Sequence, residues 1–401
     1  MDFISITFSP IPVKNIAIFK TMIKDITIIG GGIAGLTTAI ALNKIGIKTT
    51  IFEAASFIKP VGAGLALGAN AMRAFNKLGM MEEVRECGRV LPSFSIFDEK
   101  GKLITHTNSK VLSDRYGVDN FTIHRAALHQ VLSSKIESEF LHLDKRVIDM
   151  EQKENAVTIK FQDGSMHETD YLIVADGINS AVRKKLLPAT EPRYAGYTCW
   201  RAVIDNANLD ISESSETWGR TGRFGIVPLA DKKIYWFACV NAEQNNKAFK
   251  NYKTKELLDI FRNFHTPIPA ILKETKDENI LWNDIVDLKP IKKYAYNNIL
   301  LIGDAAHATT PNLGQGACQA IEDAVILADE MGKHEHYKEV FKSFEKRRLK
   351  RTHAIVNTSW SIGKVAQLEN SYLANIRNFI FRKMPASINN RQFKKLYEVD
   401  F

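Results

Sequence analysis

The chain has 401 residues, 45% hydrophobic and 25% charged, which is typical of a folded globular protein and too long for one ordinary core. Its net charge of +9 favours anionic ligands, but the one dense basic cluster, KRRLKR at 346–351, fits the solvated face of a helix better than a nucleic-acid interface. From this charge distribution we expect no nucleic-acid partner. Because no apolar run reaches the ~18 residues that cross a bilayer, we also expect no integral membrane segment.

Residues 1–21 precede the first expected strand and a second possible start, Met22. They lack the basic leading region and cleavage site of a secretory signal, and we interpret them as a loosely ordered extension or a misassigned start. Four cysteines are scattered along the chain: Cys87, Cys199, Cys239 and Cys318. Without metal-ligand spacing, they indicate buried thiols in a reducing cytoplasm and no metal site.

The first strong pattern is DITIIGGGIAGL at 25–36, followed by the helix-forming run LTTAIALNK. Strand, glycine-rich turn and helix form the context in which G-x-G-x-x-G binds a dinucleotide. Gly30 lets the chain turn off the strand, Gly32 lets the backbone approach a pyrophosphate, and Gly35 lets the helix pack on the strand. Glu53 ends the next strand eighteen positions later (53 − 35), where a carboxylate can accept hydrogen bonds from a ribose. A dinucleotide is favoured over an empty turn, but this segment does not say which one.

Residues 61–68 predict an apolar glycine-rich loop, either a surface for a flat ring or a flexible connector, before a helix capped by Asn70. Segments 94–98 and 102–107 then read as a hairpin. The pattern FTIHRAALHQVLSSKIE at 121–137 predicts an amphipathic helix.

Two further strands are expected at 145–151 and 156–162. A buried apolar strand then ends at Asp176–Gly177 and leads into a basic helix capped by Asn179 or Ser180. This places a second carboxylate at the end of a strand.

From residue 196 to about 282 helix signals fade, and YTCWRAVI, TWGRTGRFGIVPL and KKIYWFACV alternate as strands. We expect an antiparallel sheet whose aromatic side chains either line a pocket or, as is more usual in strands, form its core. These side chains are Tyr197, Trp200, Trp218, Phe224, Tyr235, Trp236 and Phe237.

A second strand–loop–helix unit spans 298–331, with a strand at 299–302 that ends in Gly303–Asp304. The loop that enters its helix contains Pro311, Gly314 and Gly316. An acid at the carboxyl end of a strand lies where ligands of open α/β sheets gather.

Three segments in this order resemble the group A flavoprotein monooxygenases, the para-hydroxybenzoate hydroxylase-like family. They are GGGIAG with Glu53, ADGINSAVR at 175–183 and IGDAAHATTPNLGQGACQAIEDA at 302–324. KPVGAG, YAGYTCWR and the RFGIVPL and YWF segments look closest to the single-component branch of urate, salicylate and 3-hydroxybenzoate hydroxylases. The resemblance implies an α/β fold: a discontinuous Rossmann-like FAD-binding domain, an antiparallel β-sheet substrate domain and a C-terminal helical region. The expected segments are an N-terminal extension (1–21), the FAD-binding domain (22–92, 119–195 and 297–332), the substrate-binding sheet (93–118 and 196–296) and the C-terminal helices (333–401).

The resemblance also implies FAD as the cofactor and NAD(P)H as a co-substrate. The residues that match the family's cofactor-binding motifs are Gly30, Gly32 and Gly35 at the pyrophosphate, Glu53 at the adenosine ribose, Arg125 near the flavin side chain or pyrophosphate, Asp176 in FAD and NAD(P)H handling, Asp304 at the ribityl chain, and Pro311, Gly314 and Gly316 at the isoalloxazine ring.

The implied reaction uses NAD(P)H and O2 and, through a flavin C4a-hydroperoxide, hydroxylates a small aromatic, anionic substrate in a monomer or homodimer. Arg223 and Tyr235 match an arginine and a tyrosine that face the substrate in urate hydroxylase-like members, and with Pro311 they are the candidate catalytic residues. From the residues alone, Arg223 could instead pair with a carboxylate at a sheet surface, and Tyr235 could be core. Asn312 stands where the urate branch has an acid. Because the neutral amide of Asn312 cannot act as a general base, this departure argues against urate as the substrate. We expect His307 to be structural.

Two other functions stay open: oxygenation of a larger substrate, as in antibiotic inactivation or isoprenoid epoxidation, and flavin binding without turnover. Residues 337–401 predict helices broken at Pro385. Within them, RNFIFRKMP has the Lys/Arg and Phe/Ile content to associate weakly with a membrane surface, although packing on the FAD-binding domain is favoured.

Overall fold

The computed structural model describes residues 25–57, 63–118, 120–206 and 208–401. The predicted N-terminal extension and residues 59–62 of KPVGAG lie outside the described residues. Within the described part, no helix is long and apolar enough to cross a membrane, and no cluster of His, Cys, Asp and Glu could hold a metal ion.

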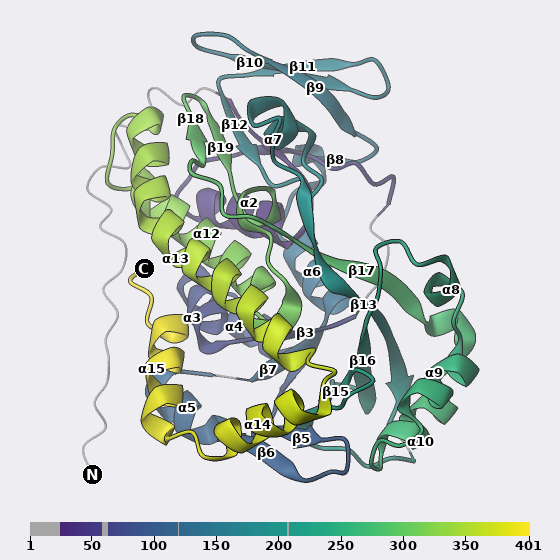
Figure 1. Ribbon diagram of the computed structural model, residues 1–401. Coiled ribbons are helices and arrows are strands. Elements are labelled where there is room, and N and C mark those ends of the chain that lie inside the picture. Colours follow the sequence, from purple (N-terminus) through teal and green to yellow (C-terminus); the bar gives the residue numbers. More distant parts are fainter. Residues whose placement is uncertain (1–24, 58–62, 119, 207) are drawn as a thin grey trace, which may run out of the picture.

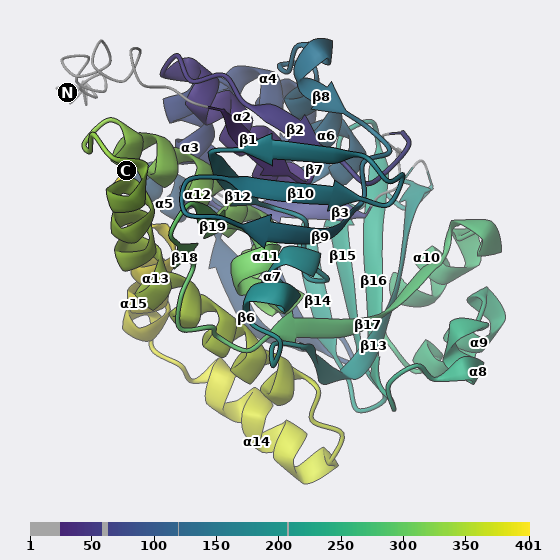
Figure 2. The same ribbon diagram turned by 90° about the horizontal axis from the view of Figure 1, so that it is seen from above.

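A six-stranded sheet brings the two glycine-rich motifs together (Figures 1 and 2). Its order is β18 (Ala295–Tyr296), β19 (Ile299–Leu301), β12 (Tyr171–Val174), β1 (Ile26–Ile29), β2 (Thr50–Phe52) and β8 (Leu141–His142). All neighbours are parallel except β18 and β19. Because parallel strands end at one edge, the residues after β1, β12 and β19 meet there, which confirms the expected α/β class.

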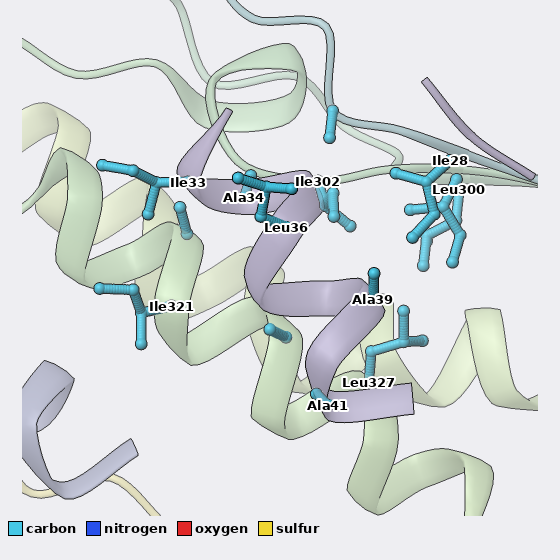
Figure 3. Packing of buried hydrophobic residues seen from close by; sticks show 14 of the residues in the cluster. Ile28, Ile33, Ala34, Leu36, Ala39, Ala41, Leu300, Ile302, Ile321 and Leu327 are labelled. Atoms are coloured by element: carbon cyan, nitrogen blue, oxygen red, sulfur yellow. The ribbon is translucent and has the colours of Figure 1, made fainter. Parts of the chain in front are cut away.

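Two helices pack on one another beside this sheet: α2 (Ile33–Lys44) and α12 (Gly316–Met331). Figure 3 shows Leu327 of α12 close to Ala39 and Ala41 of α2, with Ile28 and Leu300 of the sheet above them. Leu36, Ile321 and Ile28 are fully buried. Each contributes about 1.5–3 kcal/mol by leaving water, and the alanines let the two helices approach closely.

A seven-stranded sheet forms the other half of the molecule. Its order is β17 (Leu281–Leu288), β13 (Pro192–Asp205), β16 (Lys233–Asn241), β15 (Arg223–Pro228), β14 (Ser214–Trp218), β5 (Ser93–Asp98) and β6 (Leu103–Asn108). The predicted hairpin is thus joined to the predicted antiparallel sheet, although β14 and β5 run parallel.

One face of this sheet is covered by helices that the sequence reading missed: α8 (Lys247–Lys250), α9 (Thr254–Phe261) and α10 (Ile268–Glu274). The interpretation of 196–282 as strands without helices was therefore wrong in this part. The three helices are short, and their apolar side chains (Leu257, Phe261, Ile268 and Ile271) become recognisable as one layer only against the sheet.

Two three-stranded sheets complete the strands, with the orders β11 (Met166–Thr169), β10 (Val157–Phe161), β9 (Val147–Gln152) and β3 (Gly64–Leu67), β7 (Phe121–His124), β4 (Gly88–Val90). The second sheet corrects two predictions. Residues 64–67 are a strand within the predicted loop, and FTIH is a strand, so the helix α6 (Arg125–Ser133) begins only at Arg125.

The remaining helices are α3 (Ala69–Leu78), α4 (Met81–Glu86), α5 (Ser109–Tyr116), α7 (Ala181–Leu186), α11 (Asp304–His307), α13 (Tyr337–Ala366), α14 (Ser371–Arg382) and α15 (Ala386–Tyr397), with short 3-10 turns at η2 (Ser138–Phe140), η3 (Asp277–Asn279) and η4 (Pro311–Leu313). Ser180 caps α7, one of the two caps expected. The N-cap of α3 is Gly68 and not Asn70, whose amide instead bonds to Gln315 and Glu322.

The C-terminal helices correct two further expectations. KRRLKR is not a solvated face, because Arg347, Arg348 and Arg351 pair with carboxylates of α12. The helix that contains RNFIFR, α14, packs on β6 of the seven-stranded sheet and not on the six-stranded sheet. Its Phe381 ring lies edge-on to Trp218, 5.4 Å between centroids.

Candidate active site

A cavity of about 390 Å³ runs from the turn after β1 to the uncovered face of the seven-stranded sheet. The structure brings eight of the twelve residues singled out in the sequence to its wall: Gly32, Arg125, Arg223, Tyr235, Asp304, Pro311, Gly314 and Gly316. The other four, Gly30, Gly35, Glu53 and Asp176, lie close behind or beside this wall. Segments almost three hundred residues apart thus form one site.

The glycines after β1 have different structural duties. A Cβ on Gly30 would lie 2.3 Å from the carbonyl oxygen of Ala175, and one on Gly35 would lie 1.9 Å from the carbonyl oxygen of Gly30. A Cβ on Gly32 would meet nothing within 4 Å, although Gly32 lines the cavity and caps α2. The space beside Gly32 is therefore left open by the protein, at the end of a helix whose amides attract anions.

Two carboxylates lie at the ends of β2 and β12, the two strands that flank β1. Glu53 accepts hydrogen bonds from the backbone amides of Gly31 (2.5 Å) and Ala55 (2.8 Å), which fix its side chain beside the turn. Asp176 has a buried Oδ1 without a hydrogen-bond partner among the described residues. Burial raises the pKa of Asp176 to about 6, partly opposed by hydrogen bonds from Ser180 and backbone amides.

The third carboxylate, Asp304, opens α11 and can be reached from the cavity. Desolvation by the surrounding protein raises the pKa of the Asp304 carboxyl, and the neighbouring His307 and Arg125 partly oppose this shift. The turn is held from behind by Asp323, which accepts hydrogen bonds from the Gly303 amide (2.8 Å) and pairs with His307 Nε2 (2.7 Å). His307 is buried and does not line the cavity, in keeping with the structural role expected for it.

At the sheet end, Arg223 is buried and its guanidinium is bound on three sides. It donates to Glu216 (3.0 Å), to Asn312 Oδ1 (2.6 Å) and to Gln367 (3.0 Å), and it lies over the Tyr197 ring at 5.1 Å. Burial lowers the pKa of Arg223, but the neighbouring Cys239 and Glu216 outweigh this and hold it above its usual value. Arg223 thus pairs with a carboxylate, as one of the two expectations had it, and also lines the cavity, while its contact with a substrate stays a prediction.

Tyr235 follows on the next strand, opposite Val227 and beside Gly64. A Cβ on Gly64 would lie 2.8 Å from the tyrosine side chain, so the missing side chain makes room for the ring. Burial raises the pKa of the Tyr235 phenol, which is therefore neutral and a hydrogen-bond donor.

Asn312 occupies the position after Pro311 where an acid was noted to be missing. Its Oδ1 accepts from Arg223 and from the Tyr197 hydroxyl (3.1 Å), while its Nδ2 donates to Thr310 (2.9 Å) and to the Ser359 carbonyl (2.9 Å). Every polar atom of the side chain is used. Asn312 therefore positions Arg223 and holds no proton that it could exchange with a substrate.

Among the residues of this wall that sequence reasoning missed are four ionisable ones: Cys199, Arg201, Glu216 and Cys239. For Cys199, Arg201 and Cys239 the signal was the two-residue period of strands, since odd-numbered residues of β13, β15 and β16 face the cavity and even-numbered ones face the helices. Both alternatives for the aromatic side chains occur. Tyr235 and Phe237 line the cavity, whereas Tyr197, Trp200, Trp218, Phe224 and Trp236 are buried in packed clusters.

These features fit FAD. An open anion cradle at Gly32 is followed by a carboxylate fixed by amides at Glu53, an unpaired buried oxygen at Asp176 and a reachable carboxylate at Asp304. At the far end the amides of the 314–316 turn open the 16-residue helix α12, whose dipole favours negative charge. The donors and acceptors suit a diphosphate, a ribose, a ribityl chain and a ring that becomes anionic on reduction.

Comparison with known proteins gives three kinds of match. The family model described as "FAD binding domain" matches residues 24–359. The Stigmatella aurantiaca protein named aurachin C monooxygenase/isomerase is 36% identical over 360 residues, covering 90% of this chain and 94% of that one, and 2-heptyl-3-hydroxy-4(1H)-quinolone synthase of Pseudomonas aeruginosa is 27% identical, covering 92% and 96%. The solved structure of Klebsiella pneumoniae HpxO with FAD and uric acid is 26% identical, with a TM-score of 0.84 and coverage of 93% and 96%.

Proposed function

The chain belongs to the group A flavoprotein monooxygenases and is an FAD-dependent monooxygenase, and from that premise we propose that it hydroxylates a small planar heteroaromatic compound bearing an anionic or anion-forming oxygen. One relative is named as the synthase of a 4-quinolone, and one similar structure contains uric acid; both compounds have fused planar rings with ring carbonyl groups. NAD(P)H is the reductant typical of the family, and O2 is the proposed oxidant.

The observation that carries this substrate class is the charge of the cavity wall. At its sheet end, the titratable side chains that the structure describes include two arginines, Arg201 and Arg223, and one carboxylate, Glu216. One positive charge is therefore in excess. Because this end of the cavity is largely shielded from water, an anionic oxygen is stabilised there more strongly than at an exposed site.

The residues of the chain then have distinct duties. When bound, FAD supplies redox and oxygen-activating chemistry. The Gly32 turn, Glu53, Asp176 and Asp304 would hold it, with the ring end beside Pro311 and α12. Arg223, fixed by Glu216 and Asn312, would bind the substrate oxygen. Tyr235 would donate a hydrogen bond from its neutral phenol and orient the ring.

Hydroxylation of an aromatic carbon requires removal of a proton from the ring. Asn312 cannot accept it, and burial keeps the Tyr235 phenol neutral. A substrate that already carries or readily forms an oxyanion needs no protein base for its activation. This supports a phenolic or quinolone-type compound. Urate is disfavoured, because the urate hydroxylase branch that the sequence resembles carries an acid at the position of Asn312.

The sequence adds two expectations, on the compartment and on the number of subunits, and leaves a competing function. The four free thiols favour a reducing cytoplasm. We expect the protein to work as a monomer or homodimer. Oxygenation of a larger substrate is the competing function. Flavin binding without turnover, the other alternative left open by the sequence, does not agree with the monooxygenases that the chain matches, and steady oxidation of NAD(P)H with a small aromatic substrate would exclude it.

The test is substrate-stimulated NADH and NADPH oxidation by the FAD-loaded protein with 4-quinolones, salicylate-type acids, urate and polyketide antibiotics. For the substrate so found, Arg223→Ala should lower kcat/KM by about 100- to 1000-fold, the usual loss when one donor to a developing oxyanion is removed, with FAD content retained. The double variant Arg223→Met/Glu216→Gln removes both buried charges and relieves the unpaired carboxylate. Recovery of activity in the double variant would show that Arg223 is structural, and stimulation by urate alone would overturn the proposed substrate class.

A further inference from the structure

Helix α14 exposes a continuous apolar face. Five large side chains on it are open to solvent: Tyr372 (72%), Leu373 (48%), Ile376 (39%), Phe379 (63%) and Ile380 (53%). Their spacing of three or four residues places them in one stripe along the helix. Figures 1 and 2 show α14 at the outer edge of the molecule, away from the six-stranded sheet.

The inner face of α14 contains two buried polar residues besides Ala374 and Phe381. Arg377 and Asn378 are only 4% and 6% exposed, and Arg377 donates to the carbonyl oxygens of Val365 and Ala366 and lies 4.9 Å from the Trp218 ring. A helix on a water-exposed surface normally turns its polar side outward. Helix α14 instead buries these two polar side chains and exposes five large apolar ones, which indicates that its outer face meets something other than water.

The charge of this region identifies the kind of surface. Residues 371–397 contain six basic residues, Arg377, Arg382, Lys383, Arg391, Lys394 and Lys395, and no Asp or Glu. Lys383 at the end of α14 is exposed, as are Arg391, Lys394 and Lys395 on α15, next to a further exposed apolar residue, Ile388 (52%). Exposed aromatic and aliphatic side chains flanked by Lys and Arg match an anionic lipid surface.

We propose that the α14 face docks on the surface of an anionic lipid bilayer. Since no described helix can span a bilayer, the contact is peripheral, with the apolar stripe in the headgroup region and the basic residues beside lipid phosphates. Association of two copies through this face is disfavoured, because a twofold interface would bring the basic residues of one copy against those of the other.

Docking there has a consequence for the cavity. Phe381 on the inner side of α14 packs on Trp218, whose indole donates to Glu216 Oε1 (3.0 Å), and Glu216 lines the cavity. Two successive side chains, Phe381 and Trp218, thus connect α14 to Glu216 at the proposed substrate end. A substrate dissolved in lipid would be concentrated beside the enzyme, although the docking itself does not depend on the identity of that substrate.

The experiment is co-sedimentation of the full-length, FAD-loaded protein with vesicles of phosphatidylcholine alone or with about 30% phosphatidylglycerol. We expect binding to the mixed vesicles, weaker binding to the neutral ones, and a marked loss at about 0.5 M salt, where charges are screened within a few ångströms. Phe379→Glu should lower the partition coefficient about tenfold or more, since it removes a large apolar side chain from the contact. Lys383→Glu exchanges a positive for a negative charge and should lower it by about fivefold per unit of charge.

The matched control is Ile148→Glu, an equally exposed apolar residue (57%) on β9 that should bind vesicles like the unmodified chain. FAD absorbance shows which variants are folded, and Lys383→Glu decides if Phe379→Glu is not. Three results would overturn the proposal: no binding of the unmodified protein to anionic vesicles, equal loss in the Ile148→Glu control, or self-association in light scattering that Phe379→Glu abolishes.

Discussion

Replacing Arg348 by methionine tests the buried ion-pair network that joins α13 to the flavin end of the site. Arg348 is fully buried, with Nη1 2.6 Å from Glu322 and Nε 2.6 Å from Asp323, and both carboxylates are also fully buried. Methionine keeps part of the volume and removes the charge. Loss of one partner of a buried pair costs about 3–5 kcal/mol, because the remaining charge is left in a medium of low dielectric constant.

The structure places the expected loss at the lower end of this range. Glu322 keeps Arg351 (2.6 Å), and Asp323 keeps His307 and the Gly303 amide. We therefore expect a decrease of about 3 kcal/mol in the free energy of unfolding. Because Asp323 holds the turn that carries Asp304, part of the bound FAD should also be lost.

The assay is urea unfolding at neutral pH, followed by circular dichroism, together with the flavin absorbance of the purified protein. Arg347→Met is the control, since Arg347 lies next in sequence but is 23% exposed, and its loss should destabilise the protein less than the loss of the fully buried Arg348. In a double-mutant cycle, Arg348→Met and Asp323→Asn should be coupled by about 1–3 kcal/mol. A loss below that of Arg347→Met, or no coupling, would refute the reasoning.

The network also has a defined pH dependence. Burial raises the pKa of Asp323, but His307 and Arg348 outweigh this, so the folded-state pKa lies below the usual value. A lowered pKa of an acid contributes stability above the unfolded value, about 3.9, and this contribution is lost as the pH falls through the lowered pKa. The difference between Arg348→Met and the unmodified protein should therefore shrink in acid below about pH 4.

Two further predictions concern the cofactor end. Gly35→Ala places a Cβ 1.9 Å from the Gly30 carbonyl oxygen and should lower both the FAD content and the melting temperature of the FAD-free protein. Gly32→Ala should lower the FAD content alone, because Gly32 has ordinary backbone angles and no protein atom lies within 4 Å of the added Cβ. Equal losses of melting temperature in the two FAD-free variants would contradict this distinction. The pKa of Asp176 is raised from 3.8 to about 6, so between these pH values the folded FAD-free protein holds a proton that the unfolded chain has released. The FAD-free protein should therefore lose up to about 3 kcal/mol of stability as the pH rises from about 4 to 6. In urea titrations, Asp176→Asn should abolish this part of the pH dependence.

The cofactor end was predicted well from the sequence because its signals are local. An apolar strand, a glycine at a forced turn and a helix start follow one another within about a dozen residues at Gly30, and within eighteen residues (299–316) around Asp304. Both units are present in the structure. The exact strand 64–67 and the strand FTIH were missed, because the pattern of only four residues does not separate strand from loop or helix.

Contacts between distant segments could not be read from the sequence. The arginines at 347, 348 and 351 resemble a solvated basic face until their partners, Glu322 and Asp323, about twenty-five residues earlier, are brought beside them. The outward apolar stripe of α14 is similar, since a helical pattern shows two faces but not which one is turned toward the protein. The domain boundaries and the roles of the site residues stay predictions.

The two halves of the site also set an order of events during synthesis. The central strand β1 pairs with β2 and β12, β12 pairs with β19, and the pocket closes only with the turn at Gly316, 286 residues after Gly30 (316 − 30). At about 5–20 residues per second, a ribosome needs about 15 to 60 s to cover that distance. During this interval the turn at Gly30 has no complete cofactor site beside it. We therefore expect FAD to bind the growing chain only after Gly316 has been made.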